Sequence, residues 1–144
     1  MKIFKKYKIK IYKSIYNYKK TIFCIKRKKF YIFSYEELLR QKIILFLILE
    51  KMYKLYDIYV EKYIKIKKKI NKIDILVYKK KKPYLIIECK SPKKKITKKN
   101  FYQLLQYGNV LKNKYFFLTN GIENIFFKIK KKKIIFIKKI PKKY

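Results

Sequence analysis

The spacing of hydrophobic residues alternates between a strand-like and a helical period along the chain. Residues 1–33 alternate Lys with Ile, Tyr and Phe, which predicts short half-exposed strands or an extended arm. From 35 to 56 the apolar residues follow helical spacing. Ser34 precedes them and Glu37 follows it by three residues, which predicts a helix that begins with a capping box. Residues 58–67 alternate again and predict a strand.

The second half of the chain predicts a hairpin, a helix and further strands. Two apolar runs, 73–78 and 84–89, flank a break of lysines and one proline, which indicates a β-hairpin. A second helix is predicted over 98–112, with Thr97 as its cap and Gly108 interrupting its pattern. Further strands are predicted at 115–118, 125–130 and 133–139, with a turn at 119–121 and a loose tail at 140–144. This order predicts an α/β fold with a central mixed sheet flanked by helices.

The length of 144 residues is typical of one domain. We expect a single domain over 1–144, with a basic extension at 1–23, a core at 24–130 and a basic strand and tail at 131–144. Half of the residues are hydrophobic, so a substantial core is expected despite the high charge.

The net charge of +35 has two interpretations. One is a polyanionic partner, most simply nucleic acid, bound through phosphate contacts that weaken with salt. The other is compositional: the abundance of Lys, Ile, Tyr, Phe and Asn suggests an AT-rich coding sequence, which raises lysine content without a functional reason. A lysine therefore carries little information here, whereas an acid, an arginine or a glycine is a rare residue that needs an explanation.

Several classes of site are excluded by the residue types present. The chain has no histidine, which excludes Ser-His and Cys-His catalysis and histidine zinc sites. Cys24 and Cys89 give neither a disulfide framework nor metal-ligand spacing, and Cys89 is expected to be a small core residue. The apolar run 43–49 is too short to span a bilayer, and the N-terminus has no apolar signal region. We therefore expect a cytoplasmic protein with no membrane partner.

Two acids in the predicted hairpin are the first candidates for chemistry. Asp74 and Glu88 both lie seven positions from Lys81, so a hairpin folded about Lys81 places them on facing positions. Like charges on facing positions, about 4.5–5.5 Å apart at Cβ, are destabilising unless another group offsets them. A divalent metal such as Mg²⁺ would do so, and Lys90 on the same face as Glu88 would orient water or stabilise charge on a phosphate. The competing interpretation is a salt bridge between an acid and one of many lysines.

These residues also carry a resemblance to a known family. Asp74 followed fourteen positions later by Glu88-Cys89-Lys90 resembles the PD-(D/E)XK nuclease pattern, with Ile73 in place of its proline. More specifically, the chain resembles the N-terminal nuclease-like domain of type I restriction enzyme R subunits over roughly residues 24–127. Five segments carry this resemblance in order: Arg27-Lys28-Lys29 before Glu36-Glu37-x-x-Arg40-Gln41, Lys72-Ile73-Asp74-Ile75, Ile86-Ile87-Glu88-Cys89-Lys90-x-Pro92, Gln103-x-x-x-Tyr107, and Leu118-Thr119-Asn120-Gly121.

The resemblance implies a restriction-endonuclease-like core at 24–130 and a set of catalytic roles. Asp74 and Glu88 would ligate Mg²⁺ or Mn²⁺, and Lys90 would be the catalytic lysine. Glu37, with Glu36 beside it, would be the helix acid that assists at the metal.

The resemblance also implies residues that line the site. Gln103 and Tyr107 would do so as the Q-x-x-x-Y motif of the family. From the residues alone, Gln103 is equally a solvated helix position and Tyr107 a core aromatic. Arg40 would contact a phosphate or pair with Glu36 or Glu37 one turn earlier in the helix.

The sequence therefore predicts a Mg²⁺-dependent DNA endonuclease-like domain. The chain contains no glycine-rich P-loop, so we expect no ATP-driven motor in it. DNA is the expected partner, with RNA or branched DNA left open, and a homodimer or an unidentified protein partner is compatible with the sequence. The alternative is a non-catalytic nucleic-acid-binding protein that retains the nuclease fold.

Overall fold

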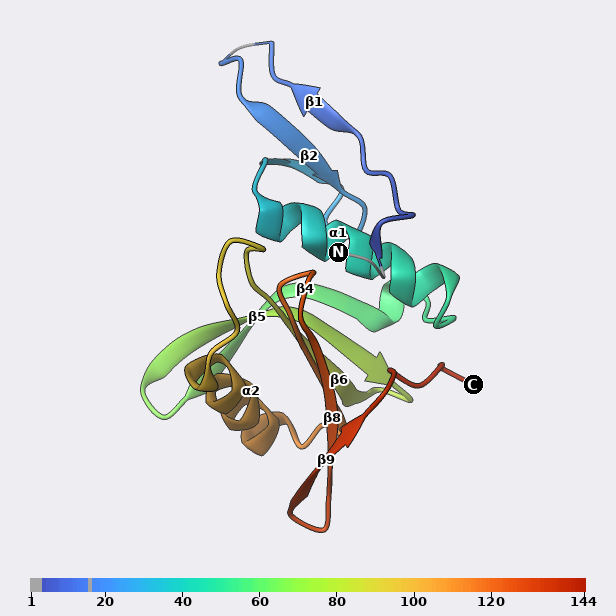
Figure 1. Cartoon of the computed structure of the whole chain (residues 1–144), viewed down its shortest axis with the longest axis vertical. Coiled ribbons are helices and arrows are strands. Elements are labelled where there is room, and N and C mark those ends of the chain that lie inside the picture. Colours follow the sequence, from blue (N-terminus) through green and yellow to red (C-terminus); the bar gives the residue numbers. More distant parts are fainter. Residues whose placement is uncertain (1–3, 16) are drawn as a thin grey trace.

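The computed structural model describes residues 4–15 and 17–144, and this part of the chain forms a small sheet, a large sheet and two α-helices (Figure 1). Residues 1–3 and 16, which belong to the predicted N-terminal extension, lie outside the described residues. The small sheet consists of β1 (Ile11–Lys13), β2 (Lys20–Cys24) and β3 (Lys29–Ile32). The large sheet consists of β4 (Ile58–Ile66), β5 (Lys69–Lys79), β6 (Lys82–Cys89), β7 (Tyr115–Thr119), β8 (Asn124–Lys130) and β9 (Lys133–Ile137). The helices are α1 (Tyr35–Leu49) and α2 (Lys98–Leu111).

The large sheet is mixed. Its strands follow chain order, and each neighbouring pair is antiparallel except β6 and β7, which are parallel. A parallel pair needs a crossover connection, and α2 supplies it. This arrangement confirms the predicted α/β fold with a central mixed sheet. No helix in the described ranges is long and apolar enough to cross a membrane.

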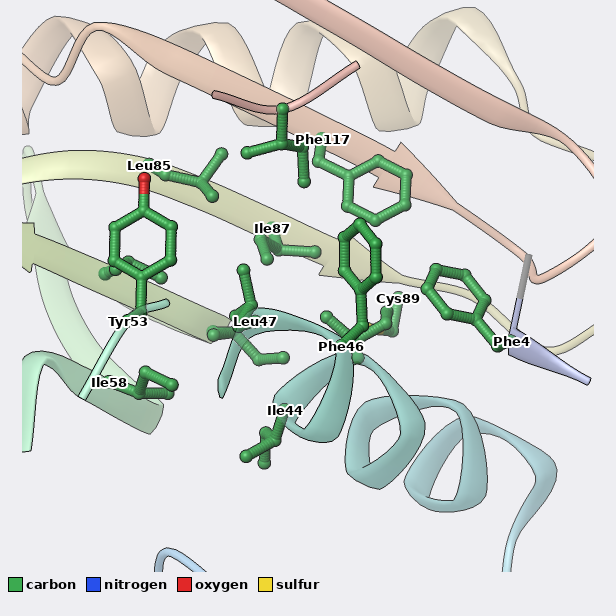
Figure 2. Packing of buried hydrophobic residues seen from close by; sticks show 14 of the residues in the cluster. Phe4, Ile44, Phe46, Leu47, Tyr53, Ile58, Leu85, Ile87, Cys89 and Phe117 are labelled. Atoms are coloured by element: carbon green, nitrogen blue, oxygen red, sulfur yellow. The ribbon is translucent and has the colours of Figure 1, made fainter. Parts of the chain in front are cut away.

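The two helices cover opposite faces of the large sheet. Leu85, Ile87 and Cys89 of β6 belong to the core cluster under α1, whereas Ile86 between them belongs to the cluster under α2. This alternation is the period of two expected for a strand buried on both faces. Figure 2 shows the cluster on the α1 side, where Phe4 from the N-terminal segment packs with its ring centroid 5.6 Å from that of Phe46.

The β5–β6 hairpin has the predicted register but a tighter turn. Ile75 pairs with Ile87 and Val77 with Leu85, the register that sets Asp74 opposite Glu88. The turn is only Lys80 and Lys81, both in the left-handed region with φ of 50° and 61°, as a type I′ hairpin turn requires. The predicted break at 79–83 was therefore too wide. Pro83 lies inside β6, next to the register shift between Val77 and Tyr78.

Helix α1 ends seven residues earlier than predicted, at Leu49 rather than at 56. Met52 adopts φ 62° in the left-handed region, and the N–H of Tyr53 donates to the carbonyl of Leu47 at 3.0 Å, so the chain reverses direction directly after the helix. The reversal brings Tyr53, only 1% exposed, into the core. The apolar residues after Leu49 had helical spacing, but of these Tyr53 is buried by the reversal, whereas Met52 and Tyr56 are exposed.

Helix α2 runs through Gly108 without a break. Thr97 Oγ1 accepts from the Asn100 N–H at 3.3 Å, which confirms the predicted cap. A Cβ at Gly108 would lie 2.4 Å from Cζ of Phe116 in β7, closer than such atoms approach one another. Glycine is needed here because α2 packs closely against the sheet.

The C-terminal tail was predicted to be loose, and this was wrong. Ile140 is 2% exposed in the core cluster under α1, and the Lys143 N–H donates to the carbonyl of Lys51 at 2.9 Å. The Lys143 Nζ also lies 2.6 Å from Oδ2 of Asp57. The tail therefore packs along the turn that follows α1.

Candidate active site

Asp74, in the middle of β5, meets Glu88 and Lys90 where β6 ends beside β7. Asp74 and Glu88 are 7% and 4% exposed, and the Lys90 Nζ lies 2.7 Å from Oε1 of Glu88. The Cys89 N–H donates to Oδ2 of Asp74 at 2.8 Å, which fixes the Asp74 carboxylate against the end of β6. The Lys90 N–H donates to the carbonyl of Thr119 at 2.8 Å and holds the strand end against β7. The hairpin therefore brings together the three residues singled out from the sequence.

Within this group, the pKa values of Glu88 and Lys90 are shifted by burial and by their charged neighbours. Burial and the neighbouring Asp74 carboxylate raise the pKa of Glu88 to about 7, although Lys90 acts in the opposite direction. Burial lowers the pKa of Lys90, but the Glu88 carboxylate outweighs it, so the net shift is upward. Oε2 of Glu88 is buried and has no hydrogen-bond partner among the described residues. A buried carboxylate oxygen with no partner favours the binding of a cation or the uptake of a proton.

Arg40 connects this group to helix α1. Its Nη2 lies 2.7 Å from Oδ1 of Asp74, and its Nη1 donates to Oε2 of Glu37. Burial alone would lower the pKa of Arg40, but Asp74 and Glu37 raise it, so the guanidinium stays charged. Of the two roles considered from the sequence, the structure shows the pairing with Glu37, and it adds Asp74 as a second partner.

Glu37 is held by side chains from three directions. Besides Arg40, the Arg27 Nη2 lies 2.6 Å from Oε1, and the Gln41 Nε2 donates to the same oxygen at 2.7 Å. The predicted capping box is therefore only half formed. Ser34 Oγ accepts from the Glu37 N–H at 3.0 Å, but the Glu37 carboxylate points to the arginines and not back to the N-cap.

Glu61 of β4 is a member of this network that sequence reasoning missed. It pairs with Arg27 Nη1, and the Lys72 Nζ lies 2.7 Å from its Oε1. The β4–β5 register places Glu61 opposite Asp74, and its φ of 53° marks an irregularity in the strand. The available signal was a rare acid in a strand adjacent to the one that carries Asp74. The two arginines of the chain, Arg27 and Arg40, both pair with acids in this network.

Tyr107 lies close to the acids, and Gln103 reaches them only through it. Tyr107 is 1% exposed, and burial together with Glu88 and Asp74 raises its pKa, although Gln103 opposes that shift. The Gln103 Nε2 donates to the Tyr107 hydroxyl at 2.5 Å. The described residues show no hydrogen bond from Gln103 to Asp74 or Glu88. Gln103 instead lines a groove between α2 and the start of β5.

The oxygen atoms present are compatible with Mg²⁺ or Mn²⁺. Within residues 4–15 and 17–144, no group of three or more Asp, Glu, His or Cys side chains is placed to hold a metal ion. Mg²⁺ requires fewer protein ligands than that, because it is held by one or two carboxylates together with waters and phosphate oxygens. Asp74 and Glu88 form such a pair. Both Asp74 oxygens already accept a hydrogen bond, so Oε2 of Glu88 is the freer donor.

An open cleft of about 920 Å³ lies beside these residues. It is bounded by β3, by the first turn of α1 and by Ser91, which directly follows Lys90. Glu36, Glu37 and Arg40 form part of its wall. Burial first, and then the Asp74 carboxylate, raise the pKa of Glu36, while Arg40 and Lys90 oppose that shift.

The comparisons with known proteins agree with this architecture. A family model described as type I restriction enzyme R protein N terminus (HSDR_N) matches residues 35–141. A search of curated proteins and a search of solved structures found no match. The matched range includes Glu37, Asp74, Glu88, Lys90 and Gln103, and it begins after β1–β3. Since the match covers most of the chain and confirms the resemblance seen in the motifs, the protein belongs to the family of type I restriction enzyme R protein N-terminal domains.

Proposed function

We propose that this protein is a Mg²⁺-dependent DNA endonuclease that hydrolyses phosphodiester bonds. The observation that carries the proposal is the Glu88 carboxylate. It is buried among apolar strands beside Asp74, it leaves Oε2 without a hydrogen-bond partner, and it places Oε1 2.7 Å from the Lys90 ammonium. Arg40 pairs with Asp74 and Lys90 pairs with Glu88, but Oε2 of Glu88 keeps no partner among the described residues, and an unpaired buried carboxylate oxygen is costly for folding alone. A divalent cation bound to that oxygen would provide the missing partner.

Each residue of the network has a role in this proposal. Asp74 and Glu88 would hold the ion, which would supply Lewis-acid chemistry at the phosphodiester. The Lys90 ammonium stabilises the negative charge that develops on the phosphate oxygens. Arg40 fixes the orientation of the Asp74 carboxylate, and Glu37 holds Arg40 in place from the helix side.

Substrate binding follows from charge and from the family. The family name refers to a restriction enzyme, whose substrate is DNA, and the net charge of +35 favours phosphate contacts along a DNA backbone. Tyr107 borders the acids on the side of α2, and Gln103 holds its hydroxyl.

The proposal is tested by cleavage assays on supercoiled plasmid and linear duplex, with Mg²⁺ or Mn²⁺ and with chelator. We expect metal-dependent nicking by the wild-type protein. Lys90→Ala should reduce its rate by about 10²–10³-fold, because it removes a charge that stabilises the transition state. Lys95→Ala is the matched control, since it removes an equal charge from an exposed position in the following loop and should leave the rate unchanged.

A second function is favoured by one observation. Both Asp74 oxygens and one Glu88 oxygen are already occupied by protein donors, as in a site that serves structure and not catalysis. Under this alternative the protein binds nucleic acid without cleaving it. DNA binding by wild-type and Lys90→Ala proteins, with no metal-dependent cleavage of any substrate by either, would sink the nuclease proposal and leave this one.

A further inference from the structure

The β1–β3 sheet carries exposed apolar side chains on its outer face. Its registers pair Phe23 with Phe30 and align Tyr12 and Ile32 with Thr21, so these side chains share one face. The opposite face, with Ile22 and Cys24 fully buried, lies over α1 (Figure 1). We call the outer face the platform; its members and exposed fractions are Tyr12 at 39%, Phe23 at 37%, Phe30 at 57% and Ile32 at 64%.

The rings of the platform form a row. The Phe30 ring centroid lies 5.3 Å from that of Tyr12 and 5.2 Å from that of Phe23, with the rings edge to face. Contiguous exposed apolar side chains of this kind often mark a binding surface. The platform also precedes the range matched by the family model, so it is not accounted for by the candidate active site.

The charge around the platform indicates the kind of occupant. No acidic residue precedes Glu36 in the chain, and the exposed lysines of the small sheet and its turns include Lys13, which lines a hollow with Tyr12 and Phe30, and Lys19. The Lys10 Nζ lies 4.9 Å from the Tyr12 ring centroid. Flat aromatic rings bordered by cations match a ligand that combines flat apolar groups with negative charge. Unpaired bases on a phosphate backbone have both properties.

The platform leads to the candidate active site. Phe30 lines a shallow hollow of about 320 Å³ with Tyr12 and Lys13, and it also lines the larger cleft of about 920 Å³. That cleft continues past Tyr35 to Ser91, the residue after Lys90. A strand bound on the platform therefore has an open path toward Glu88 and Lys90.

We propose that the platform binds single-stranded nucleic acid by stacking unpaired bases on Tyr12, Phe23 and Phe30, and that the cleft leads the strand to Lys90. A duplex does not fit this role, because its bases cover one another's faces. The binding half of the inference is independent of catalysis. The path to Lys90 rests on the proposed nuclease function.

The binding half is tested by fluorescence anisotropy in chelator, so that cleavage plays no part. The probes are oligothymidine of about 16 nucleotides, the upper site size of comparable single-strand sites, and a blunt duplex with the same number of phosphates. Phe30→Leu keeps an apolar side chain but cannot stack, and we expect it to weaken oligothymidine binding about fivefold or more. Phe30→Tyr should bind as the wild type does, and duplex affinity should not change in either variant.

Phe136→Leu is the matched control, because Phe136 is an aromatic residue of β9 in the other sheet with an exposed fraction of 67%. Tyr12→Leu at the edge strand is a second test variant if Phe30→Leu fails to fold. The inference would be overturned if Phe30→Leu weakened binding of oligothymidine and of the duplex equally. It would also be overturned if oligothymidine affinity were unchanged in both Phe30→Leu and Tyr12→Leu. A change in sedimentation of these variants would overturn it too, since it would show that the platform contacts a second copy. If the platform binds oligothymidine as expected but no cleavage is observed, the binding half of the inference stands and only the proposed nuclease function is rejected.

Discussion

Glu88 is surrounded by apolar strand residues, and its acidity depends on the fold around it. Burial and Asp74 raise its pKa from the ordinary 4.5 to about 7, so the folded protein holds a proton at a pH where the unfolded chain has released it. Between those two values the folded state binds more protons than the unfolded state. Stability from this group is therefore fully present below pH 4.5 and decreases as the pH rises through 7.

Replacing Glu88 by glutamine should remove this dependence. In metal-free buffer we expect the wild-type free energy of unfolding, relative to Glu88→Gln, to fall by about 3 kcal/mol across this interval and then to level off. Urea unfolding at a series of pH values measures it. The lowered pKa values of Glu50 and Glu61 act at more acidic pH and are common to both proteins, so they cancel. Parallel pH curves for the two proteins would show that the fold does not perturb Glu88.

At the scale of elements, the contact between α2 and β7 depends on the absence of a side chain at Gly108. Glycine to alanine inside a helix normally stabilises by about 1 kcal/mol. Here the new Cβ would lie 2.4 Å from Phe116, whose ring is buried and stacked on Phe127 with centroids 4.6 Å apart. We therefore expect Gly108→Ala to destabilise by about 1–3 kcal/mol.

Thermal or urea unfolding checks this prediction, with Asn109→Ala as the control at the next, exposed helix position. The control should be neutral or slightly stabilising, because alanine favours the helix and nothing opposes it. Adding Phe116→Leu should recover part of the loss in Gly108→Ala, since the two residues are in contact. A stabilised Gly108→Ala protein would show that the helix can move away from the sheet.

Local patterns predicted the elements better than their ends. The register of the β5–β6 hairpin followed from the equal spacing of Asp74 and Glu88 about Lys81, because a hairpin turn fixes its own strands. The end of α1 was not predictable in the same way. Tyr53 continues the helical spacing, and only the core into which it packs determines that the chain reverses first.

In the candidate site too, local sequence patterns predicted some residues, and tertiary packing determined the others. Asp74, Glu88 and Lys90 were found because one hairpin carries all three. The position of Glu61 depends on how β4 packs against that hairpin, and the pairing of Arg40 with Asp74 depends on how α1 does. Neither arrangement can be predicted from the spacing of residues within one segment. Tertiary packing also explains the half-formed capping box, because Arg27 and Arg40 bind the Glu37 carboxylate in place of the N–H of Ser34.

At the scale of the whole molecule, the charge is unevenly distributed. Of the eight acids in the chain, five gather around the candidate site: Glu36, Glu37, Glu61, Asp74 and Glu88. The first 35 residues contain none, and the turn of the β8–β9 hairpin is formed by lysines. If the positive charge is only compositional, every exposed lysine should contribute equally to DNA binding. If DNA follows the cleft, lysines at its rim should contribute more than lysines elsewhere.

The salt dependence of duplex binding separates these two cases. Lys93 lies at the rim of the cleft, with its Nζ 5.5 Å from the Tyr35 ring centroid, whereas Lys133 is exposed at the start of β9. We expect Lys93→Ala to reduce the slope of log affinity against log salt by about one, because one phosphate contact and its released counterion are lost. Lys133→Ala should leave the slope unchanged. Equal reductions in both variants would mean that DNA is held by the charge of the whole surface and that the cleft does not direct it.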